Sequence, residues 1–344
     1  MYYLTTYFDI HYLSRGLVLY DSLKKQKDKF QLYVLCLDQE VFEFLSIHTN
    51  RYPEIITLSL EEIEVVDSEL LASKSNRNKV EYYFTLSPCL PLFILKKYNI
   101  PHICSMDVDL MFFSSLKPIF DKLDDYSIII TPHDFIPELK SSEIFGIYNV
   151  SFQIFKNDNE GVDCLESWRK NCINWCYDRL EYGKFADQKY LDSWPKKFKK
   201  ILADNVPGAG AAPWNIKKYK ITSRNGEIFL NNDKLIFFHY QGLRIVNGRL
   251  IRHNLGSYKT NPGKMLIREI YKPYIEYLML QQGDDSGIER LKNPGRDSIL
   301  KYMIYEKDWF FYYKSKLFKK NFILKAINRI LLLPTYLLNN GKNN

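Results

Sequence analysis

Short apolar runs recur along the first hundred residues, separated by longer segments with a helical pattern. Four runs are typical of buried strands, at residues 2–8, 31–37, 55–60 and 102–106. The segments between them are predicted helices, at residues 15–25, 39–47, 61–72 and 80–98. In the last segment, Pro88 and Pro91 predict an interruption, because proline lacks the amide N–H of a helical residue. This alternation predicts an α/β fold with a mainly parallel sheet flanked by helices.

The pattern is less regular beyond residue 110. Helices are predicted at residues 114–123, 161–180 and 187–194, and strands at 127–131, 148–155 and within 228–240. Small residues form a predicted loop at 207–213. We expect a main domain at residues 1–262 and a helical, basic C-terminal extension at residues 263–344, because basic and apolar residues gather in the tail.

The end of this extension is amphipathic. Ile323, Ile327 and Ile330 share one helical face, and Lys319 and Lys325 lie beside them. Such a helix fits an anionic membrane surface, and it equally fits a helix packed on the domain with its basic side in solvent. Amphipathicity alone does not separate the two, so both stay open.

Composition and charge narrow the class of protein. A hydrophobic fraction of 46% and a charged fraction of 26% are typical of folded globular chains and exclude a disordered one. The net charge of +8 raises the question of nucleic acid. The basic residues form no recognition motif and increase toward the C-terminus, so we expect a membrane surface rather than nucleic acid.

The cysteines and the N-terminus indicate a compartment. Six cysteines are scattered without a Cys-x-x-Cys pair, which favours reduced, buried thiols over a metal site. The chain begins with a predicted strand instead of a basic segment followed by a long apolar one. No stretch is apolar enough to span a bilayer. We therefore expect a cytoplasmic protein, with peripheral contact at the inner membrane face left open by the tail.

The strongest chemical signal is Asp107-Val108-Asp109, directly after the predicted strand 102–106. On an extended chain, side chains at positions i and i+2 point to the same side. Two carboxylates placed in this way repel each other unless a cation lies between them. Carboxylate oxygens are ligands of hard divalent cations. The motif predicts a metal at the strand end, where it could hold the diphosphate of a nucleotide sugar.

A lone Asp-x-Asp occurs by chance in many proteins, but three further features follow it in order. Asn149 and Ser151 begin a predicted strand, Asp187 opens a predicted helix, and His239 ends an apolar strand. With these residues the chain resembles glycosyltransferases of the GT-A fold, most of all the family 8-like group with bacterial members of capsule or lipopolysaccharide assembly. The resemblance covers roughly residues 2–242. It is carried by EYYFT at 81–85, DVD at 107–109, YNVS at 148–151, FADQKYL at 185–191, PGAG at 207–210, PWN at 213–215 and HYQG at 239–242.

This resemblance implies metal-dependent transfer of a sugar from a nucleotide-diphosphate donor to a glycan or lipid-linked acceptor. The expected donor is a UDP-sugar. Asp107 and Asp109 match the family's metal-binding pair, and His239 would complete the metal shell. Neutral imidazole beside two carboxylates suits Mn²⁺, and Mg²⁺ would be tolerated. A buried core histidine is the plain alternative for His239.

The resemblance also implies contacts to the nucleotide. Its members place the end of the first strand against the base, which corresponds here to Thr5, Thr6 and Tyr7, and ordinary strand residues are the alternative. Arg77 and Lys79 could neutralise the diphosphate, although a solvated loop fits them equally well. Val108 belongs to the same expected donor site.

Candidates on the sugar side come from two segments. Asn149 and Ser151 share one side of their strand by alternation, and would face the donor sugar or the acceptor. Asp187 and Gln188 match the family's Asp-Gln pair and are the catalytic candidates. A helix N-terminus capped by Asp187 is the alternative, and both can hold together. An inverting reaction would need a carboxylate base, either Asp187 or Asp134, whereas in a retaining one the diphosphate could take the proton.

One departure from the family follows Gly242. Family members continue with a Gly-x-x-Lys segment that contacts the diphosphate, whereas Arg244 is the nearest cation here, so Gly242 and Arg244 are the candidates for that role. Trp214 and Asn215 are candidates for the acceptor site.

Two other functions stay open. A sugar nucleotidyltransferase needs a glycine-rich phosphate loop after the first strand, and residues 9–16 contain a single glycine. A non-catalytic carbohydrate-binding or scaffold protein on the same fold would tolerate loss of the metal residues, all of which are present.

Overall fold

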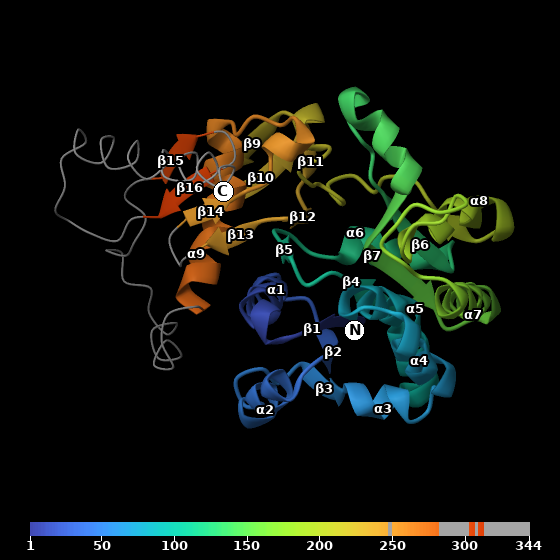
Figure 1. Cartoon of the computed structure of the whole chain (residues 1–344). Helices are drawn as coiled ribbons and strands as arrows, with labels where there is room; N and C mark the ends of the chain where they lie inside the picture. The colour runs from blue at the N-terminus through green and yellow to red at the C-terminus, as the bar shows by residue number, and fades with distance from the viewer. Residues whose placement is uncertain (247–249, 282–302, 307–308, 313–344) are drawn as a thin grey trace, which may run out of the picture.

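The computed structural model describes residues 1–246, 250–281, 303–306 and 309–312 (Figure 1). Its central sheet has seven strands in the order β3-β2-β1-β4-β7-β6-β8. They are β1 (Tyr2–Phe8), β2 (Phe30–Cys36), β3 (Ile55–Ser59), β4 (His102–Met106), β6 (Ile128–Pro132), β7 (Tyr148–Lys156) and β8 (Ile201–Leu202). Neighbouring strands are parallel except where β7 pairs with β4 and β6. The predicted α/β class with a mainly parallel, mixed sheet is confirmed.

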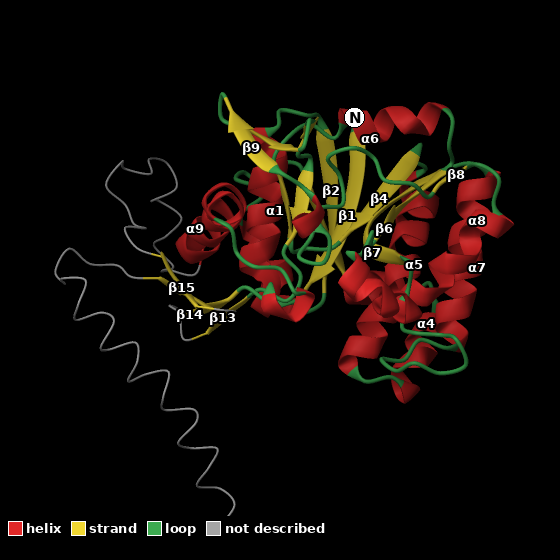
Figure 2. Cartoon of the chain, turned by 90° about the horizontal axis from the view of Figure 1, so that it is seen from above, coloured by secondary structure: helices red, strands yellow, loops and turns green. Residues whose placement is uncertain are grey.

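Helices cover both faces of this sheet (Figure 2). Successive side chains of a strand point to opposite faces. Leu4 and Phe8 of β1 therefore pack into one apolar cluster with α1 (Leu13–Lys25) and α2 (Gln39–Ile47). Tyr3 and Tyr7 of the same strand pack into a second cluster, with α5 (Lys79–Tyr98) and α7 (Asn159–Asn174). Because helices cover both faces, a ligand can reach the sheet only where the parallel strands end, at their carboxyl termini.

Helix α5 corrects the expected break at its prolines. The helix runs without interruption from Lys79 to Tyr98, with Pro88 and Pro91 inside it. A proline inside a helix costs about 3 kcal/mol or more. Two features offset this cost: a capping box between Asn78 and Glu81, and burial of most of the helix between the sheet and α7.

Capping residues explain two other differences from the predicted helices. The predicted helix 61–72 is two helices, α3 (Leu60–Glu64) and α4 (Ser68–Ser73). Asp67 interrupts it, because its carboxylate accepts the N–H of Leu70 at 2.9 Å and so starts α4. The predicted helix 161–180 ends early, at Asn174, because Trp175 is extended.

A smaller part of the fold sits beside the carboxyl end of the sheet. β5 (Leu110–Phe112) follows β4 almost directly and pairs antiparallel with β12 (Phe237–His239). Two further sheets lie beyond this pair. One contains β9 (Ile221–Arg224), β10 (Glu227–Leu230) and β11 (Asp233–Lys234), and the other contains β13 (Arg244–Val246), β14 (Leu250–Arg252), β15 (Met303–Glu306) and β16 (Trp309–Tyr312).

The described part of the C-terminal extension contains helix and strand. A π-helical stretch, Leu266–Tyr271, continues into α9 (Lys272–Gln281). Its apolar residues pack in one cluster with Val18 of α1 and Met111 of β5. No helix among the described residues is long and apolar enough to cross a membrane. The domain boundary at residue 262 stays a prediction, and the amphipathic tail lies outside the described residues.

Candidate metal and donor site

Backbone hydrogen bonds bring the two aspartates and the histidine to one corner of the fold. The amide of Asp107 donates to the Ser151 carbonyl at 2.9 Å, which continues the β4–β7 pairing by one residue. The amide of Tyr240 donates to the Asp109 carbonyl at 3.0 Å, one step beyond the β5–β12 pairing. His239 is therefore held against Asp109 by the backbone, although 130 positions separate them in the chain.

The three side chains converge. His239 Nε2 lies 3.0 Å from Asp109 Oδ1 and 3.7 Å from Asp107 Oδ2. One ligand atom from each residue lies within 4.8 Å of the other two, so the group could hold a metal ion. The side chains are 38% exposed for Asp107, 15% for Asp109 and 5% for His239, so Asp107 faces solvent while the histidine forms the inner wall.

The donor set fits a divalent cation. Both ring nitrogens of His239 are buried without a hydrogen-bond partner among the described residues, despite the short separation from Asp109. The distance is thus short enough for a hydrogen bond, but the alignment is missing. A lone pair on Nε2 and two carboxylates form a ligand set that suits Mn²⁺ or a similar ion. The edge of the Trp214 ring system packs against the imidazole, with centroids 5.3 Å apart.

Burial and mutual charge shift the three pKa values. Burial acts to raise the pKa of Asp107, His239 lowers it and the charge of Asp109 raises it, and together they bring this pKa to about 6. Burial also acts to raise the pKa of Asp109, but His239 and Arg15 hold it below its ordinary value. Burial acts to lower the pKa of His239, and the two aspartates raise it above the ordinary value. Asp107 and Asp109 thus share a single histidine as their cation. Excess negative charge of this kind favours binding of a positively charged ligand.

The first strand does not present its threonines at an open rim. Thr5 is fully buried, and its Oγ1 donates to the Tyr33 carbonyl at 3.0 Å. Thr6 is also buried, and its Oγ1 has no partner among the described residues. The Tyr7 hydroxyl lies 3.0 Å from Ser87 Oγ of α5. Contacts of these three residues with a base stay a prediction, and burial of both threonines does not favour it.

The two predicted diphosphate cations lie in different settings. Arg77 is buried and donates to the Tyr177 hydroxyl at 2.6 Å and to the Ile173 carbonyl at 3.1 Å, so its guanidinium is committed to the end of α7. Lys79 is exposed, and its Nζ lies 3.1 Å from Asp9 Oδ2 at the end of β1. Of the two, only Lys79 is available to an incoming anion.

Asp187 is a buried carboxyl behind the metal corner. It is 2% exposed, and its Oδ2 has no hydrogen-bond partner in the described structure. Its pKa is raised to about 7, mainly by burial; a hydrogen bond from Ser87 acts to lower this pKa and the charge of Asp107 acts to raise it. Asp187 is the N-cap residue of the short 3₁₀ helix that follows, as the alternative expected, but its side chain makes no cap hydrogen bond to that helix.

The remaining sugar-side candidates lie around Asp187. Asn149 and Ser151 are buried on β7, where Asn149 Oδ1 accepts the Ser151 amide at 3.0 Å. Gln188 is half-buried, and its Nε2 donates to the Phe145 carbonyl at 3.2 Å. The Gln188 side chain fills the space beside Gly146, where an added Cβ would lie 3.0 Å from it.

The segment after His239 turns away through Gly242. Gly242 has φ +74°, where any other side chain would be strained, and an added Cβ would also force the Asn254 side chain to move. Arg244 is exposed on β13, opposite Arg252 of β14. The structure gives Arg244 no contact with the aspartates, and its role at a diphosphate stays a prediction.

Some residues that shape the corner are not evident from the sequence pattern. Arg15, near the start of α1, donates to the Leu243 carbonyl at 2.9 Å and lowers the pKa of Asp109. Ser87 lies in a buried helix and contacts both Tyr7 and Asp187. Asn215, expected at the acceptor, is buried and donates to the His133 and Gly210 carbonyls. The only sequence signal for Arg15 is its position after the first strand.

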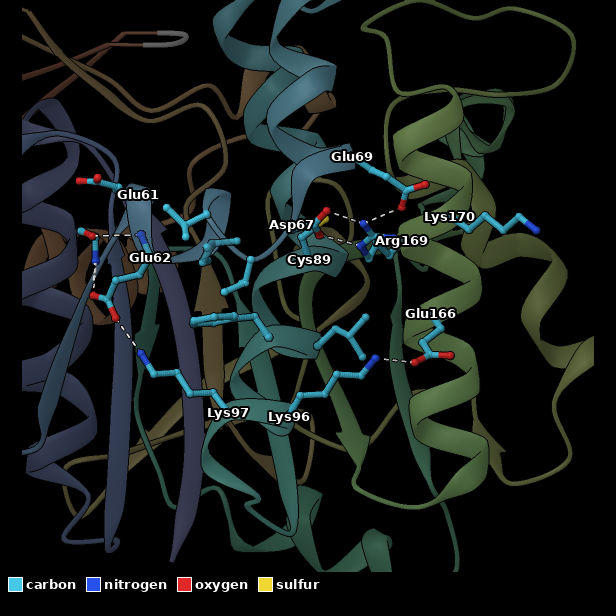
Figure 3. A pocket seen from close by; sticks show the side chains of 16 residues that line it. Glu61, Glu62, Asp67, Glu69, Cys89, Lys96, Lys97, Glu166, Arg169 and Lys170 are labelled. Carbon is cyan, nitrogen blue, oxygen red and sulfur yellow. Dashed lines mark hydrogen bonds and ion pairs between the residues drawn. The ribbon is translucent and has the colours of Figure 1, made fainter.

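A cavity of about 1050 Å³ lies away from this corner, between the α3–α4 segment, α5 and α7 (Figure 3). None of the candidate site residues lines it. Four of its five acidic side chains are paired with cations of the fold: Asp67 and Glu69 with Arg169, Glu62 with Lys97 and Glu166 with Lys96. Most of its acidic side chains thus have a lysine or arginine of the fold beside them, whereas the two aspartates of the metal corner have only a histidine within 4 Å in the described structure.

Comparison with known proteins gives two curated relatives, both from Bacillus subtilis (strain 168). The chain is 33% identical over 258 residues to "Uncharacterized protein YfnD", covering 74% of this chain and 81% of that protein. It is 27% identical over 277 residues to "Uncharacterized protein YfnF", covering 78% of this chain and 89% of that protein. No protein-family model matches the chain.

Several solved structures are similar at lower identity. Mouse xyloside xylosyltransferase 1 is 14% identical over 59% of this chain and 85% of its own, with a TM-score of 0.41. The glycosyltransferase GlyE of Streptococcus pneumoniae TIGR4 is 13% identical over 87% of this chain and 66% of its own, with a TM-score of 0.46. The galactosyltransferase LgtC is 13% identical over 70% of this chain and 87% of its own, with a TM-score of 0.46. Because these TM-scores are below 0.5, we draw no conclusion about activity from the three structures.

Proposed function

This chain belongs to the same family as Bacillus subtilis YfnD, and we propose that it is a metal-dependent glycosyltransferase of the GT-A, family 8-like type. The observation that carries the proposal is the convergence of Asp107, Asp109 and His239 at the carboxyl end of the sheet. Ligands in open α/β sheets bind outside the carboxyl ends of the strands. The sequence resemblance over residues 2–242 supports the same reaction class.

Asp107, Asp109 and His239 would hold Mn²⁺ or Mg²⁺. When bound, the cation would act as a Lewis acid on the diphosphate of a nucleotide-sugar donor and stabilise the charge of the leaving group. Asp107 is the exposed side of the site, so a diphosphate could reach the cation there from solvent. His239, buried against Trp214, sets the inner side of the ligand shell.

The chain's own residues supply the rest of the donor site. Lys79 lies at the end of the first strand, paired with Asp9, where it can move to an incoming phosphate. Val108, Asn149 and Ser151 are assigned to the same donor site, supported by the hydrogen bond from the Asp107 amide to the Ser151 carbonyl. Gly242 and Arg244 follow His239 and are assigned to the closing side, with UDP as the expected nucleotide.

Asp187 is the carboxyl best placed to move a proton. With a pKa of about 7, it is close to half protonated at neutral pH and can donate a hydrogen bond to, or accept one from, a sugar hydroxyl. The other carboxyl considered, Asp134, is bound to Lys218 and accepts the Tyr219 hydroxyl, so both of its oxygens already have partners. Gln188 follows Asp187 and would lie beside the reacting sugar carbon.

The acceptor would be a glycan or a lipid-linked glycan of the cell surface, as in the bacterial group that the sequence resembles. The competing function is a carbohydrate-binding or scaffold protein on the same fold. It differs in one measurable respect, because it would bind a sugar without turning over a donor.

A panel of nucleotide sugars, tested with and without Mn²⁺, examines the proposal. We expect Mn²⁺-dependent binding of at least one donor and slow release of its sugar to water. Asp109→Asn should abolish both, whereas the matched control Asp121→Asn, an exposed aspartate paired with Lys117, should preserve them. Donor binding that is unchanged by removal of Mn²⁺ and by Asp109→Asn would contradict the metal site. Donor binding without any turnover would favour the scaffold alternative.

A further inference from the structure

A cation of α1 lies beside the metal corner without a carboxylate in contact with it. Arg15 is half-buried in the first turn of this helix, which follows β1 along the chain. Its Nη2 donates to the Leu243 carbonyl at 2.9 Å, and its Cζ lies 4.7 Å from the centroid of the Tyr12 ring. No ion pair within the described ranges includes Arg15. Both contacts are with neutral groups, so the positive charge of Arg15 stays unbalanced.

Two sets of contacts connect Arg15 with Asp109. The Leu243 amide donates to the Tyr240 carbonyl at 3.0 Å, and the Tyr240 amide donates to the Asp109 carbonyl at 3.0 Å. Helix α9, which packs beside α1 (Figure 2), stacks its Tyr274 ring on the Tyr240 ring, with centroids 3.6 Å apart. Burial raises the pKa of the Tyr274 hydroxyl, the charge of Arg15 lowers it and that of Asp109 raises it, so this hydroxyl lies near both charges.

The charge balance of an occupied corner calls for a further cation. A divalent ion neutralises the carboxylates of Asp107 and Asp109. The diphosphate of a nucleotide sugar brings more negative charge, which increases as the sugar leaves. The metal alone therefore does not balance the leaving group, and a permanently charged guanidinium beside the metal would stabilise it.

The other cations considered for this role are less suited to it. Lys79 is paired with Asp9 at 3.1 Å. Arg77 is buried, and its guanidinium is committed to the end of α7. Arg244 is exposed on β13, and the described structure gives it no contact with the metal-binding aspartates. Of these four cations, Arg15 combines an unbalanced charge with a position beside the metal corner.

We propose that Arg15 binds the diphosphate of the donor beside the metal and stabilises its charge as the sugar leaves. A guanidinium has several N–H donors, so the hydrogen bond to Leu243 leaves others for phosphate oxygens. The inference rests on the proposed function, because that function supplies the diphosphate. It adds a residue of α1 to the donor site.

The test separates a charge that binds phosphate from a residue that only holds the fold. Binding of Mn²⁺, and of UDP, dTDP, GDP and ADP with saturating Mn²⁺, is measured on the full chain by isothermal titration. In Arg15→Gln we expect affinity for the nucleoside diphosphate that the parent binds best to fall about tenfold to a hundredfold. Mn²⁺ affinity without nucleotide should stay at the parent value or rise by up to about threefold, because a positive charge near Asp109 repels the ion.

Two further variants serve as controls. Arg15→Lys keeps the charge but lacks the planar guanidinium, so it should lose less nucleotide affinity than Arg15→Gln. Arg51→Gln removes a matched cation, because Arg51 is also half-buried and its Cζ lies 5.3 Å from the centroid of the Tyr52 ring. Arg51 precedes β3, at the opposite end of the sheet, so both affinities should stay within about twofold of the parent.

Three results would overturn the proposal. Arg15→Gln binds the nucleoside diphosphate as tightly as the parent, or the parent binds none of the nucleoside diphosphates with Mn²⁺. Alternatively, Arg15→Gln weakens Mn²⁺ and nucleotide binding together, and Arg15 is then a structural support for the Leu243 segment. A parent that binds a nucleoside diphosphate with Mn²⁺ but transfers no sugar would contradict the proposed function instead, and the opposite effects of Arg15→Gln on the two affinities would still support phosphate binding by Arg15.

Discussion

The metal corner and the cavity of Figure 3 both collect charged side chains, but they balance charge differently. In the cavity, Arg169 binds both Asp67 and Glu69, and Glu62 and Glu166 have a lysine each. In the corner, Asp107 and Asp109 share one histidine, whose charge depends on a proton. A cluster in which permanently charged cations of the fold meet most of the acids is stable as a structural element without a ligand. A cluster with excess negative charge is completed only by a cation from outside.

The largest difference is expected for Mn²⁺ affinity. Asp109→Asn removes one of two charged ligands, and we expect Mn²⁺ binding by isothermal titration to weaken by about a hundredfold or more. Glu166→Gln in the cavity removes a carboxylate that already has its cation, so Mn²⁺ affinity should be unchanged. Equal losses in both variants would show that the corner is not the metal site.

The free energy of unfolding should depend on pH through the titration of the buried Asp187. Its pKa is about 7 in the folded protein against 3.8 ordinarily, so the folded state holds its proton to higher pH than the unfolded chain. The stability that this provides is complete below pH 3.8 and is lost as the pH rises through about 7.

Asp187→Asn should remove this loss. We expect the parent to lose on the order of 2 kcal/mol more than the variant between pH 5 and 8, in urea unfolding without metal. Parallel stability profiles for the two proteins would mean that Asp187 keeps an ordinary pKa.

Within the cavity, the most enclosed ion pair should matter most. Arg169 and Asp67 side chains are 20% and 14% exposed, and the guanidinium also reaches Glu69. Arg169→Met leaves Asp67 without its cation and should lower the free energy of unfolding by about 1–2 kcal/mol. Mn²⁺ affinity should stay at the parent value. A parallel loss of metal binding would couple the two regions and undo the comparison.

The smallest effect is expected at the exposed rim of the cavity. Lys96 and Glu166 are 59% and 49% exposed, so solvent screens their attraction. Lys96→Met should change the free energy of unfolding by less than about 0.5 kcal/mol, measured in the same urea titrations. A cost as large as that of Arg169→Met would mean that the cavity's ion pairs act as one network.

Local pattern was sufficient for much of the fold. The strands β1, β2, β3 and β4 were predicted within two residues of their observed bounds, because short apolar runs between helical segments have few other solutions. The same pattern failed at α5, where packing between the sheet and α7 overrides the breaking effect of two prolines. The packing that stabilises α5 comes from segments distant in the chain, so it cannot be predicted from the local sequence.

The candidate site divides in the same way. Asp107 and Asp109 were evident from their spacing on a strand end, since alternation along an extended chain is a local property. The commitment of Arg77 to the Tyr177 hydroxyl was not evident, because that contact joins residues 100 positions apart.

The sequence by itself determined the α/β alternation, the pair of carboxylates and the family resemblance that nominates His239. The tertiary structure decided which of these groups carry unbalanced charge. It placed His239 against the aspartates through the β5–β12 pairing and buried Asp187 without a partner for its Oδ2. It also brought Arg15 of α1 to the Leu243 carbonyl, beside the same corner. Desolvation and charge pairing depend on which distant segments meet, so only the folded chain sets them.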